Sequence, residues 1–278
     1  MKYDELKKIL ARYSITDFSV CSIEAIPEFE IEMPLDIPEE LSYLKKDSRK
    51  HPRFFYPEAR SVLVMVHQYW HSSQNYEEKL KSIGNIYEFI KSKYSRYLSF
   101  NKENPKIARY ALVEEYHKKI RKISKDIIAD IKKIEADIKY KIFVDSSPVY
   151  EKKLAQFMGL GFIGKNTLLV SPSYGSYVFI SGIMLNKDIT ETPPLKKTEI
   201  MCGSCELCIR RCPTKALSPL GIDPSRCISF WTTHTTRKAP DFIISASDFI
   251  FGCDICQEVC PFNSKSIKGK SIFNINAS

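Results

Sequence analysis

The spacing of hydrophobic positions switches between helical and strand periods along the first two thirds of the chain. Apolar residues three and four positions apart predict helices over 2–13, 76–98 and 112–138. Compact apolar runs predict strands at FSVCSI (18–23), SVLVMVHQY (61–69) and YKIFVD (140–145). Two more strands, joined by a turn rich in Pro, Ser and Gly, are expected within 162–185. Strands alternating with helices indicate an α/β or α+β domain.

A further helix is predicted in SSPVYEKKLAQFMG, directly after the strand that ends at Asp145. Ser146 or Ser147 is suited to cap it, and Pro148 to its first turn. Gly159 is suited to end it. Asp145 therefore stands where a strand passes into a helix, a common place for functional side chains in α/β folds. Its position leaves open whether it acts chemically or only caps the helix.

Two stretches without regular hydrophobic periodicity indicate loops and a domain boundary. The segment 26–60 is rich in Pro, Glu and Arg and is expected to form loops with one short helix. The stretch PPLKKTE (193–199) is typical of a linker, and a cysteine-rich, loop-rich segment follows it. We therefore expect a larger domain over 1–192 and a smaller one over 193–278.

The composition is that of an ordinary globular protein, with 44% hydrophobic and 27% charged residues in a chain of 278. The N-terminal residues MKYDELKKILARYS are charged and amphipathic, unlike a signal peptide. No apolar run approaches the ~20 residues that a membrane-spanning helix needs. We expect a soluble, cytoplasmic protein.

Lysine and arginine exceed aspartate and glutamate by nine, which suits a polyanionic partner such as nucleic acid. The helix predicted over 112–138 carries an apolar stripe of isoleucines, at positions 120, 123, 127, 131 and 134. Its opposite face is basic, with Lys118, Lys119, Arg121, Lys122, Lys125, Lys132 and Lys133. Both a solvated helix face and an RNA-facing one explain this pattern.

Eight of the nine cysteines are concentrated between Cys202 and Cys260, whereas Cys21 lies in an apolar strand and is expected to be a core residue. Disulfides are unusual in a reducing compartment, so this concentration of thiols predicts metal binding. The first motif, CGSCELCIRRCP, has the spacing C-x2-C-x2-C-x3-C-P. The second motif, CDICQEVCP, supplies three cysteines, and Cys227 between the motifs completes a set of eight.

This spacing predicts two [4Fe–4S] clusters, because in the bacterial run the fourth thiolate binds the other cluster. One cluster is expected to be held by Cys202, Cys205, Cys208 and Cys260. The other is expected to be held by Cys212, Cys227, Cys253 and Cys256. Paired CxxC elements also form zinc sites, but the x2-x2-x3 spacing and the Cys-Pro ending both motifs favour iron–sulfur. The motifs therefore predict electron transfer and do not specify a substrate.

The stretch GLGFIGK (159–165) has the glycines and lysine of a phosphate-binding loop without its context. Asn166 follows where Mg²⁺ coordination needs Ser or Thr. The stretch also follows a helix and enters a strand, the reverse of a phosphate loop, so we reject nucleotide binding here. The five histidines are scattered and do not predict a histidine-rich metal site.

Several stretches occur together in one order: RKHPRFFYPEARSV, IARYALVEEYHKKIRK, VDSSPVYEKKLAQFMGLGFIGKNTLLVSPSYGSYVF, CGSCELCIRRCPTKAL, RCISF and FGCDICQEVCPFN. In these motifs the chain resembles the epoxyqueuosine reductases over roughly residues 40 to 264. The resemblance implies an N-terminal cobalamin-binding domain and a ferredoxin-like domain with two [4Fe–4S] clusters. It implies a cytoplasmic enzyme that reduces epoxyqueuosine to queuosine at the wobble position of tRNA, in a short form without the C-terminal helical-repeat extension.

The resemblance also implies roles for single residues. Asp145 would be the proton donor. Corrinoid contacts would fall at Arg49, Ala108, Asp145, Leu169, Ile180, Ser229 and Asp254. The family's cysteine assignment agrees with the two sets of four above. Opening an epoxide requires a nearby acid, and burial beside the corrin is expected to raise the Asp145 pKa. The implied partners are tRNA with a queuosine-type anticodon loop and an external low-potential electron donor, with the protein a monomer and no membrane involved.

Three stretches depart from the usual pattern of the family. Lys152 stands where Arg is common, ALVEEYH (111–117) replaces a pattern ending in RDYH, and WTTHTT (231–236) is unusual. These departures spare the cofactor residues and fall where substrate is read. Two alternatives therefore stay open: a corrinoid iron–sulfur reductase of a small molecule, resembling reductive dehalogenases, and a non-enzymatic two-cluster electron carrier.

Overall fold

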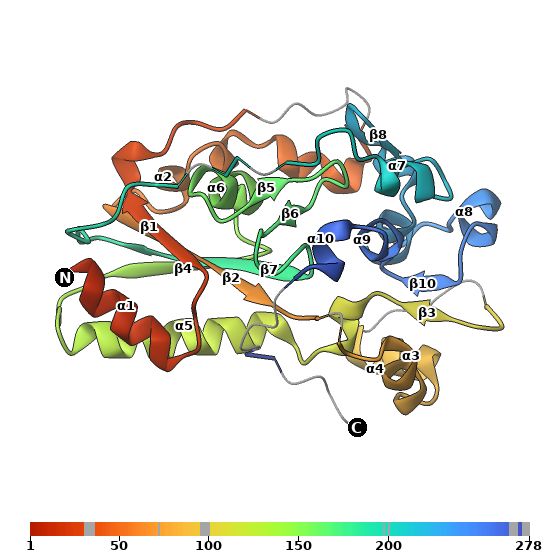
Figure 1. Ribbon diagram of the computed structural model, residues 1–278, viewed down its shortest axis with the longest axis horizontal. Helices are drawn as coiled ribbons and strands as arrows, with labels where there is room; N and C mark the ends of the chain where they lie inside the picture. Colours follow the sequence, from red (N-terminus) through yellow and green to blue (C-terminus); the bar gives the residue numbers. More distant parts are fainter. Residues whose placement is uncertain are drawn as a thin grey trace.

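A four-stranded sheet lies at the centre of the computed structural model, which describes residues 1–30, 37–71, 73–94, 101–196, 198–199, 201–266 and 272–273. The strands lie in the order β1-β2-β7-β4, and each pairs antiparallel with its neighbour (Figure 1). Their bounds are Phe18–Ser22 for β1, Ser61–Gln68 for β2, Val178–Leu185 for β7 and Tyr140–Val144 for β4. The strands predicted at 18–23, 61–69 and 140–145 are confirmed, and the antiparallel pairing makes the fold α+β. Of the two strands predicted within 162–185, the second corresponds to β7, whereas the first is divided into two short strands outside this sheet.

Helices cover both faces of this sheet. The helices α1 (Tyr3–Arg12) and α5 (Tyr116–Lys132) lie against one face, and α6 (Glu151–Phe157) lies against the other (Figure 1). Every residue of β2 is buried, and its side chains alternate between the two layers. Val62, Val64 and Val66 pack on the α6 side, whereas Leu63 and Met65 pack on the side of α1 and α5. Burial on both faces explains why this strand reads as a continuous apolar run.

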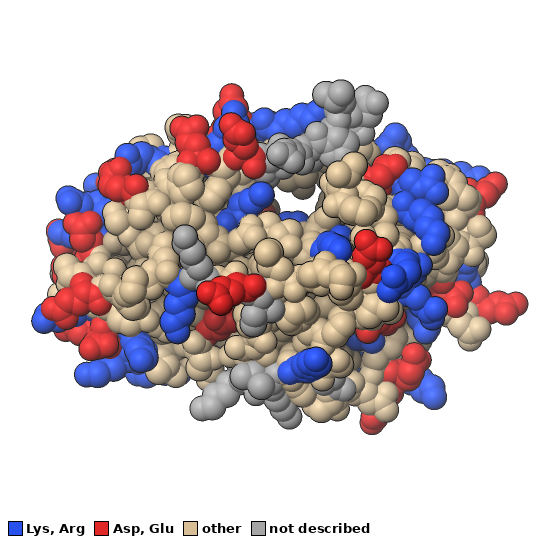
Figure 2. Space-filling model, turned by 45° about the horizontal axis from the view of Figure 1, so that its top comes forward, with Lys and Arg blue, Asp and Glu red and all other residues tan. Residues whose placement is uncertain are grey.

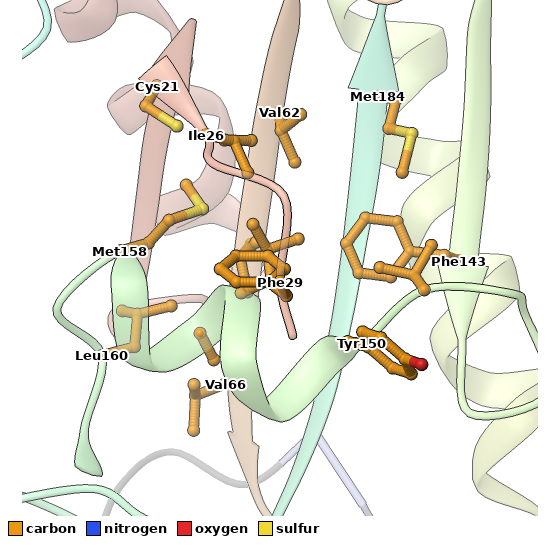
Figure 3. Packing of buried hydrophobic residues seen from close by; sticks show 14 of the residues in the cluster. Cys21, Ile26, Phe29, Val62, Val66, Phe143, Tyr150, Met158, Leu160 and Met184 are labelled. Carbon is orange, nitrogen blue, oxygen red and sulfur yellow. The ribbon is translucent and has the colours of Figure 1, made fainter. Parts of the chain in front are cut away.

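The core beneath α6 joins side chains from distant parts of the chain. In Figure 3, Phe143 of β4 and Met158 at the end of α6 lie in the same layer of side chains as Val62 and Val66 of β2. Full burial of such side chains contributes ~1.5–3 kcal/mol each. Cys21 lies in the same core with 5% of its surface exposed, which confirms its predicted structural role.

The single helix predicted over 76–98 is wrong, because the structure has two helices there. These are α3 (Tyr76–Ser82) and α4 (Ile86–Tyr94). Gly84 separates them with a φ of +70°, in the left-handed region that favours glycine. The Asn85 side chain then accepts hydrogen bonds from two backbone amides of α4. Positions 95–98 of the prediction lie outside the described residues.

The helix predicted over 112–138 is shorter in the structure. A 3-10 turn, Arg109–Leu112, comes first, and α5 runs from Tyr116 to Lys132. Ile120, Ile127 and Ile131 are buried as predicted. Ile134 lies beyond the end of α5 and is 48% exposed.

The helix after Asp145 also begins later than predicted. α6 starts at Glu151, and its N-cap is Tyr150, so neither Ser146 nor Ser147 caps it. The Ser147 hydroxyl instead accepts a hydrogen bond from the Val144 amide over 3.3 Å, which stabilises the turn after β4. The predicted stop is confirmed, since Gly159 adopts a φ of +77° just after the helix.

The remaining N-terminal elements are short. α2 (Pro52–Phe55) is the α-helix in the described part of 26–60, where 3-10 turns form the other regular structure; positions 31–36 lie outside the description. β5 (Phe162–Ile163) pairs antiparallel with β6 (Leu169–Val170). Within the described residues, no helix combines the length and the apolar character needed to cross a membrane.

The cysteine-rich segment forms short elements on the right of Figure 1. Its helices are α7 (Leu207–Arg211), α8 (Asp241–Ser245), α9 (Ile255–Glu258) and α10 (Pro261–Ser264). Its strands are β8 (Leu217–Ser218), β9 (Gly221–Ile222) and β10 (Phe249–Phe251). β10 pairs in parallel with β3 (Lys106–Ile107), so strand pairing crosses the boundary expected at 192/193. The two-domain division stays a prediction.

Candidate active site and cysteine cavities

The eight C-terminal cysteines line two cavities, four in each. One cavity, of about 400 Å³, is lined by Cys202, Cys205, Cys208 and Cys260. The other, of about 390 Å³, is lined by Cys212, Cys227, Cys253 and Cys256. The grouping is the one that the spacing predicts, and the assignment of each thiolate to a cluster stays a prediction. Among the described residues no three His, Cys, Asp or Glu side chains form a site for a single metal ion; the thiols stand around a space instead.

The chemistry of these thiols fits a bound cationic group. All nine cysteines are free thiols, so no disulfide competes for them. Burial raises the pKa of Cys253 and Cys256 above the usual range for a thiol. Holding such buried groups as thiolates requires compensating positive charge, which the iron of a cluster supplies.

The GLGFIGK stretch, rejected as a phosphate loop, contributes to the first cysteine cavity. Gly164, Lys165 and Asn166 line this cavity, and Asn166 also lines the second one. The Lys165 amide donates a hydrogen bond to Cys202 Sγ over 3.4 Å, and its ammonium donates to the Gly203 carbonyl over 3.0 Å. Hydrogen bonds to cluster sulfurs tune the reduction potential of a cluster. The GLGFIGK stretch is therefore expected to act on the first cysteine cavity and not as a phosphate-binding loop.

Asp145 does not cap α6 but accepts hydrogen bonds from the first turn of α5. Its Oδ2 accepts from the Tyr116 hydroxyl over 2.6 Å and from His117 Nε2 over 2.9 Å. Asp145 adopts a φ of +52°, a conformation rare outside glycine and characteristic of functional sites. The other ring nitrogen of His117 lies 3.1 Å from a carboxylate oxygen of Glu115, which fixes the ring. The capping interpretation of Asp145 is therefore wrong.

Asp145 opens onto a hollow of about 530 Å³, hereafter the acid hollow. Its walls are mostly apolar and aromatic, with a few polar groups, and its lining consists of Tyr116, Asp145, Glu151, Lys152, Leu168, Leu169, Ser176, Val178, Phe179 and Ile180. The Tyr116 ring stacks on Phe179 with centroids 4.0 Å apart and planes tilted by 8°. A concave surface that combines apolar walls with a few convergent polar groups is typical of a ligand site.

The pKa of Asp145 is shifted opposite to the expectation from sequence. The hydrogen bond from His117 lowers it, outweighing the desolvation that would raise it, and Tyr116 adds to the lowering. The same contact raises the pKa of His117. The Asp145 side chain is also 60% exposed, so burial is not the dominant influence. The shared hydrogen bond therefore favours the imidazolium–carboxylate form of the pair.

Two neighbouring residues of α6 have charges that the hollow disfavours. Glu151 Oε1 is buried and has no hydrogen-bond partner within the described structure. Desolvation, followed by the charge of Asp145, raises the pKa of Glu151 well above its usual value. The Lys152 ammonium donates to the Thr167 carbonyl over 2.7 Å, and desolvation lowers its pKa.

The structure brings together only part of the predicted corrinoid set. Asp145, Leu169 and Ile180 line the acid hollow, the last two from β6 and β7. Arg49 does not line it; this residue is buried, lies 4.9 Å from the Tyr43 ring centroid and donates to the Val149 carbonyl.

The other three predicted contacts also lie outside the lining of the acid hollow. Ala108 is buried, and its amide donates to the Phe251 carbonyl over 2.8 Å. Asp254 is fully buried and accepts from the amide and the guanidinium of Arg109, over 2.7 and 3.0 Å. Ser229 precedes a π-helical turn, Phe230–His234. These contacts connect the cysteine-rich segment to the N-terminal part.

Residues of the three stretches that depart from the family pattern lie near the acid hollow. Lys152 lines the hollow, and the departing residue Glu115 lies 3.1 Å from His117 Nδ1. Tyr116 and His117, which hold the Asp145 carboxylate, belong to the part of ALVEEYH that matches the family pattern. His234, within WTTHTT, lies close enough for its charge to lower the Asp145 pKa. Sequence reasoning missed His117 because it counted the histidines as scattered, and it missed Glu151 because no motif marks a buried carboxyl.

The fold and these sites define an iron–sulfur protein in which two four-cysteine cavities accompany an acid-lined hollow. A family model described as 4Fe-4S double cluster binding domain matches residues 201–263. A second model, described as epoxyqueuosine reductase QueG, DUF1730, matches residues 49–146. The chain belongs to the epoxyqueuosine reductase family.

Curated relatives carry the same description. The epoxyqueuosine reductase of Leadbetterella byssophila is 35% identical over 209 residues, covering 69% of this chain and 68% of the relative. That of Cyclobacterium marinum is 32% identical over 244 residues, covering 86% and 71%. The chain thus spans about 70% of the length of these two relatives.

Solved structures share the fold. The epoxyqueuosine reductase from Streptococcus thermophilus aligns with a TM-score of 0.70 at 22% identity, covering 97% of this chain and 68% of the other. An epoxyqueuosine reductase crystallised with a tRNA-Tyr epoxyqueuosine-modified stem loop aligns with a TM-score of 0.66 at 25% identity, covering 98% and 67%. A catabolic reductive dehalogenase aligns with a TM-score of 0.50 at 15% identity, covering 93% and 31%, a likeness of fold alone.

Proposed function

We propose that the protein reduces epoxyqueuosine to queuosine at the wobble position of tRNA. The observation that carries this function is the acid hollow, where Asp145, Tyr116 and His117 meet in a molecule that also contains the two cysteine cavities. Family membership supports it, as does the relative crystallised with an epoxyqueuosine-modified stem loop. The chain's net charge of +9 suits a tRNA partner. Figure 2 shows Lys and Arg side chains interspersed with Asp and Glu over one face. Electrostatic attraction of tRNA to this face would therefore be distributed over many side chains and not concentrated in one basic patch.

We infer that the acid hollow binds cobalamin. The apolar wall formed by Leu169, Val178 and Ile180 suits the edge of a corrin ring. When bound, cobalamin would supply the strongly reducing centre that side chains lack. Arg49, Ala108, Ser229 and Asp254 would contribute more distant contacts, as the family pattern implies.

The protein's own part in the reaction is proton delivery. Asp145 would protonate the oxygen of the opening epoxide, because an alkoxide is a poor leaving group. His117 is hydrogen-bonded to the Asp145 carboxylate over 2.9 Å and would be the immediate source of that proton. Tyr116 holds the same carboxylate oxygen and limits its rotation.

Electrons would reach the acid hollow through two [4Fe–4S] clusters, held by the two sets of four cysteines. We propose an external low-potential electron donor and a monomeric protein. An exposed basic groove lined by Arg210, Arg211 and Lys215 opens beside Cys212, where an acidic carrier protein would dock.

A second candidate is reduction of a small molecule by the same machinery. It is favoured by one observation, the position of the departing residue Lys152 in the lining of the acid hollow. A small substrate would not depend on phosphate contacts, so its turnover would be nearly independent of salt, whereas tRNA turnover would fall steeply.

The test uses the anaerobically purified protein, cobalamin and reduced methyl viologen as electron donor. The substrate is tRNA from cells that accumulate epoxyqueuosine, and nucleosides are quantified by mass spectrometry. We expect queuosine to appear and Asp145→Asn to lose at least 100-fold in rate. Asp188→Asn is the matched control, since Asp188 is half exposed and paired with Arg60. A wild-type protein that binds cobalamin and the tRNA but produces no queuosine would contradict the proposal.

A further inference from the structure

We propose that Glu151 is a second proton donor in the acid hollow, an inference that rests on the proposed function. Converting an epoxide to an alkene breaks both carbon–oxygen bonds, forms one carbon–carbon double bond and releases the oxygen as water. This change consumes two electrons and two protons. The external one-electron donor supplies the electrons, and the Asp145–His117 pair holds one proton. The second proton needs another source.

Glu151 lies where such a source is needed. It is the first residue of α6, and both it and Asp145 line the acid hollow. Its Oε1 is buried and unpartnered within the described structure, so no protein group there competes for a proton on that oxygen. The two acids lie close enough together that the charge of Asp145 raises the pKa of Glu151.

The surroundings push the two carboxyls toward opposite protonation states. Asp145 is kept ionised by His117 and Tyr116, whereas desolvation and the Asp145 charge raise the pKa of Glu151. Paired carboxyls with opposite shifts are the usual arrangement of an acid and its ionised partner in enzymes.

The other charged groups around Glu151 do not reverse this assignment. Arg49 and Arg121 lower the pKa of Glu151, but their effects are smaller than those of desolvation and of the Asp145 charge, which raise it. The charge of Glu151 raises the pKa of Lys152, but the Lys152 ammonium donates its hydrogen bond to the Thr167 carbonyl and not to Glu151. Tyr116 also faces Glu151 and donates its hydroxyl proton to Asp145. The surroundings of Glu151 therefore favour its protonated form.

A purely structural role for Glu151 makes a different prediction. In such a role Glu151 would only help to fix the left-handed backbone of Asp145. Glu151→Gln retains an acceptor oxygen of the same shape but has no acidic proton. A positioning residue would tolerate this change, whereas a proton donor would not.

The first measurement is carbon-13 NMR titration of side-chain carboxyls in the cobalamin-free protein with its iron–sulfur clusters in place. We expect one glutamate to titrate far above the usual ~4.3 and its signal to vanish in Glu151→Gln. If every glutamate titrates at or below the usual value, the inference is overturned whatever the activity.

The second measurement is queuosine formation against pH, with reduced methyl viologen as donor and with cluster and cobalamin absorption matched between variants. We expect Glu151→Gln to lose about 100-fold and Glu151→Asp to recover part of the rate. The wild-type rate should fall as pH rises through the Glu151 pKa, and that limb should disappear in Glu151→Gln. Glu58→Gln, on the surface beside Lys139, serves as control.

The outcomes separate this inference from the proposed function. An active wild type with an equally active Glu151→Gln would show that water supplies the second proton, which overturns the role of Glu151 alone. A wild type that forms no queuosine would overturn the proposed function and, with it, this proton donor.

Discussion

His117 donates a hydrogen bond to the Asp145 carboxylate over 2.9 Å, although α5 carries one residue and the loop after β4 carries the other. The contact joins a helix on one face of the sheet to a loop that leads into a helix on the opposite face. It lowers the pKa of Asp145 and raises that of His117. The pair therefore acts as one titrating unit that stores a single proton.

Removing the imidazole should raise the Asp145 pKa. In His117→Ala the main stabilisation of the carboxylate is lost, and the desolvation that opposes it remains. Carbon-13 NMR titration of the Asp145 carboxyl measures this shift directly. We expect queuosine formation at neutral pH to fall roughly 10- to 100-fold, because Asp145 loses its immediate proton source. His71→Ala is the matched control, since His71 contacts Ser73 and Ser266 away from the hollow. An unchanged Asp145 titration would contradict this account.

Iron content should distinguish the cysteines of the cavities from the one in the core. Two four-iron clusters correspond to about eight irons per chain. Cys256→Ala should lose about half of that iron and its associated absorption, since Cys256 lines the second cavity. Cys21→Ala should keep all of it and lose only stability, because Cys21 is buried in the core beneath α6. Equal iron in both variants would count against the cluster assignment.

Asp17 should make stability depend on pH. Desolvation raises its pKa to about 6, although Ser171 donates a hydrogen bond to its carboxylate over 3.1 Å. Because the folded-state pKa is higher than the unfolded value, the folded protein binds more protons between pH 4 and 6. Its contribution to stability is present below the unfolded pKa and is lost as pH rises through the folded one.

The variant Asp17→Asn should remove this dependence. We expect its free energy of unfolding at pH 7 to exceed that of the wild type by roughly 2–3 kcal/mol, with the difference vanishing near pH 3. Urea denaturation at several pH values measures it. A parallel pH dependence in both proteins would contradict the prediction.

Alanine substitutions at Gly159 and Gly84 should measure how much a steric clash with neighbouring backbone lowers the free energy of unfolding. Both have φ values near +70°, so replacement by alanine strains the backbone in each by roughly 1 kcal/mol. A Cβ at Gly84 meets nothing within 4 Å, whereas one at Gly159 would lie 2.0 Å from the Lys196 carbonyl oxygen. Gly159→Ala should therefore lower the free energy of unfolding by several kcal/mol more than Gly84→Ala, as measured by denaturant titration. Equal losses would show that residue 196 can move aside freely.

Local pattern predicted the central elements well. The run SVLVMVHQY could only be a strand buried on both faces, and β2 is buried throughout. The grouping of cysteines was also accessible, because a fixed ligand spacing constrains which thiols can share a cluster. Pattern failed at helix boundaries: Gly84 and Asn85 divide a predicted helix, since a turn and a cap outweigh an apolar period that runs across them.

The acid hollow was predictable only in part. Asp145 stood out by its place at the end of a strand, but its partners lie 28 and 29 positions earlier in the chain, a separation that no local pattern encodes. The direction of its pKa shift depended on those partners, so reasoning from burial alone gave the wrong sign. Glu151 was hidden for the opposite reason: helical sequences carry many glutamates, and only the packed structure distinguishes a buried one.

The pairing of β3 with β10 couples iron loading to the acid chemistry. Phe251 and Asp254, on either side of Cys253, hold Ala108 and Arg109 through hydrogen bonds. Those two residues begin the short connection that leads into α5 and thus to Tyr116 and His117. A chain that failed to acquire its iron would release this connection and lose the geometry around Asp145 as well. Such a chain would be inactive toward substrate from the start, and would not open epoxides without the means to finish the reduction.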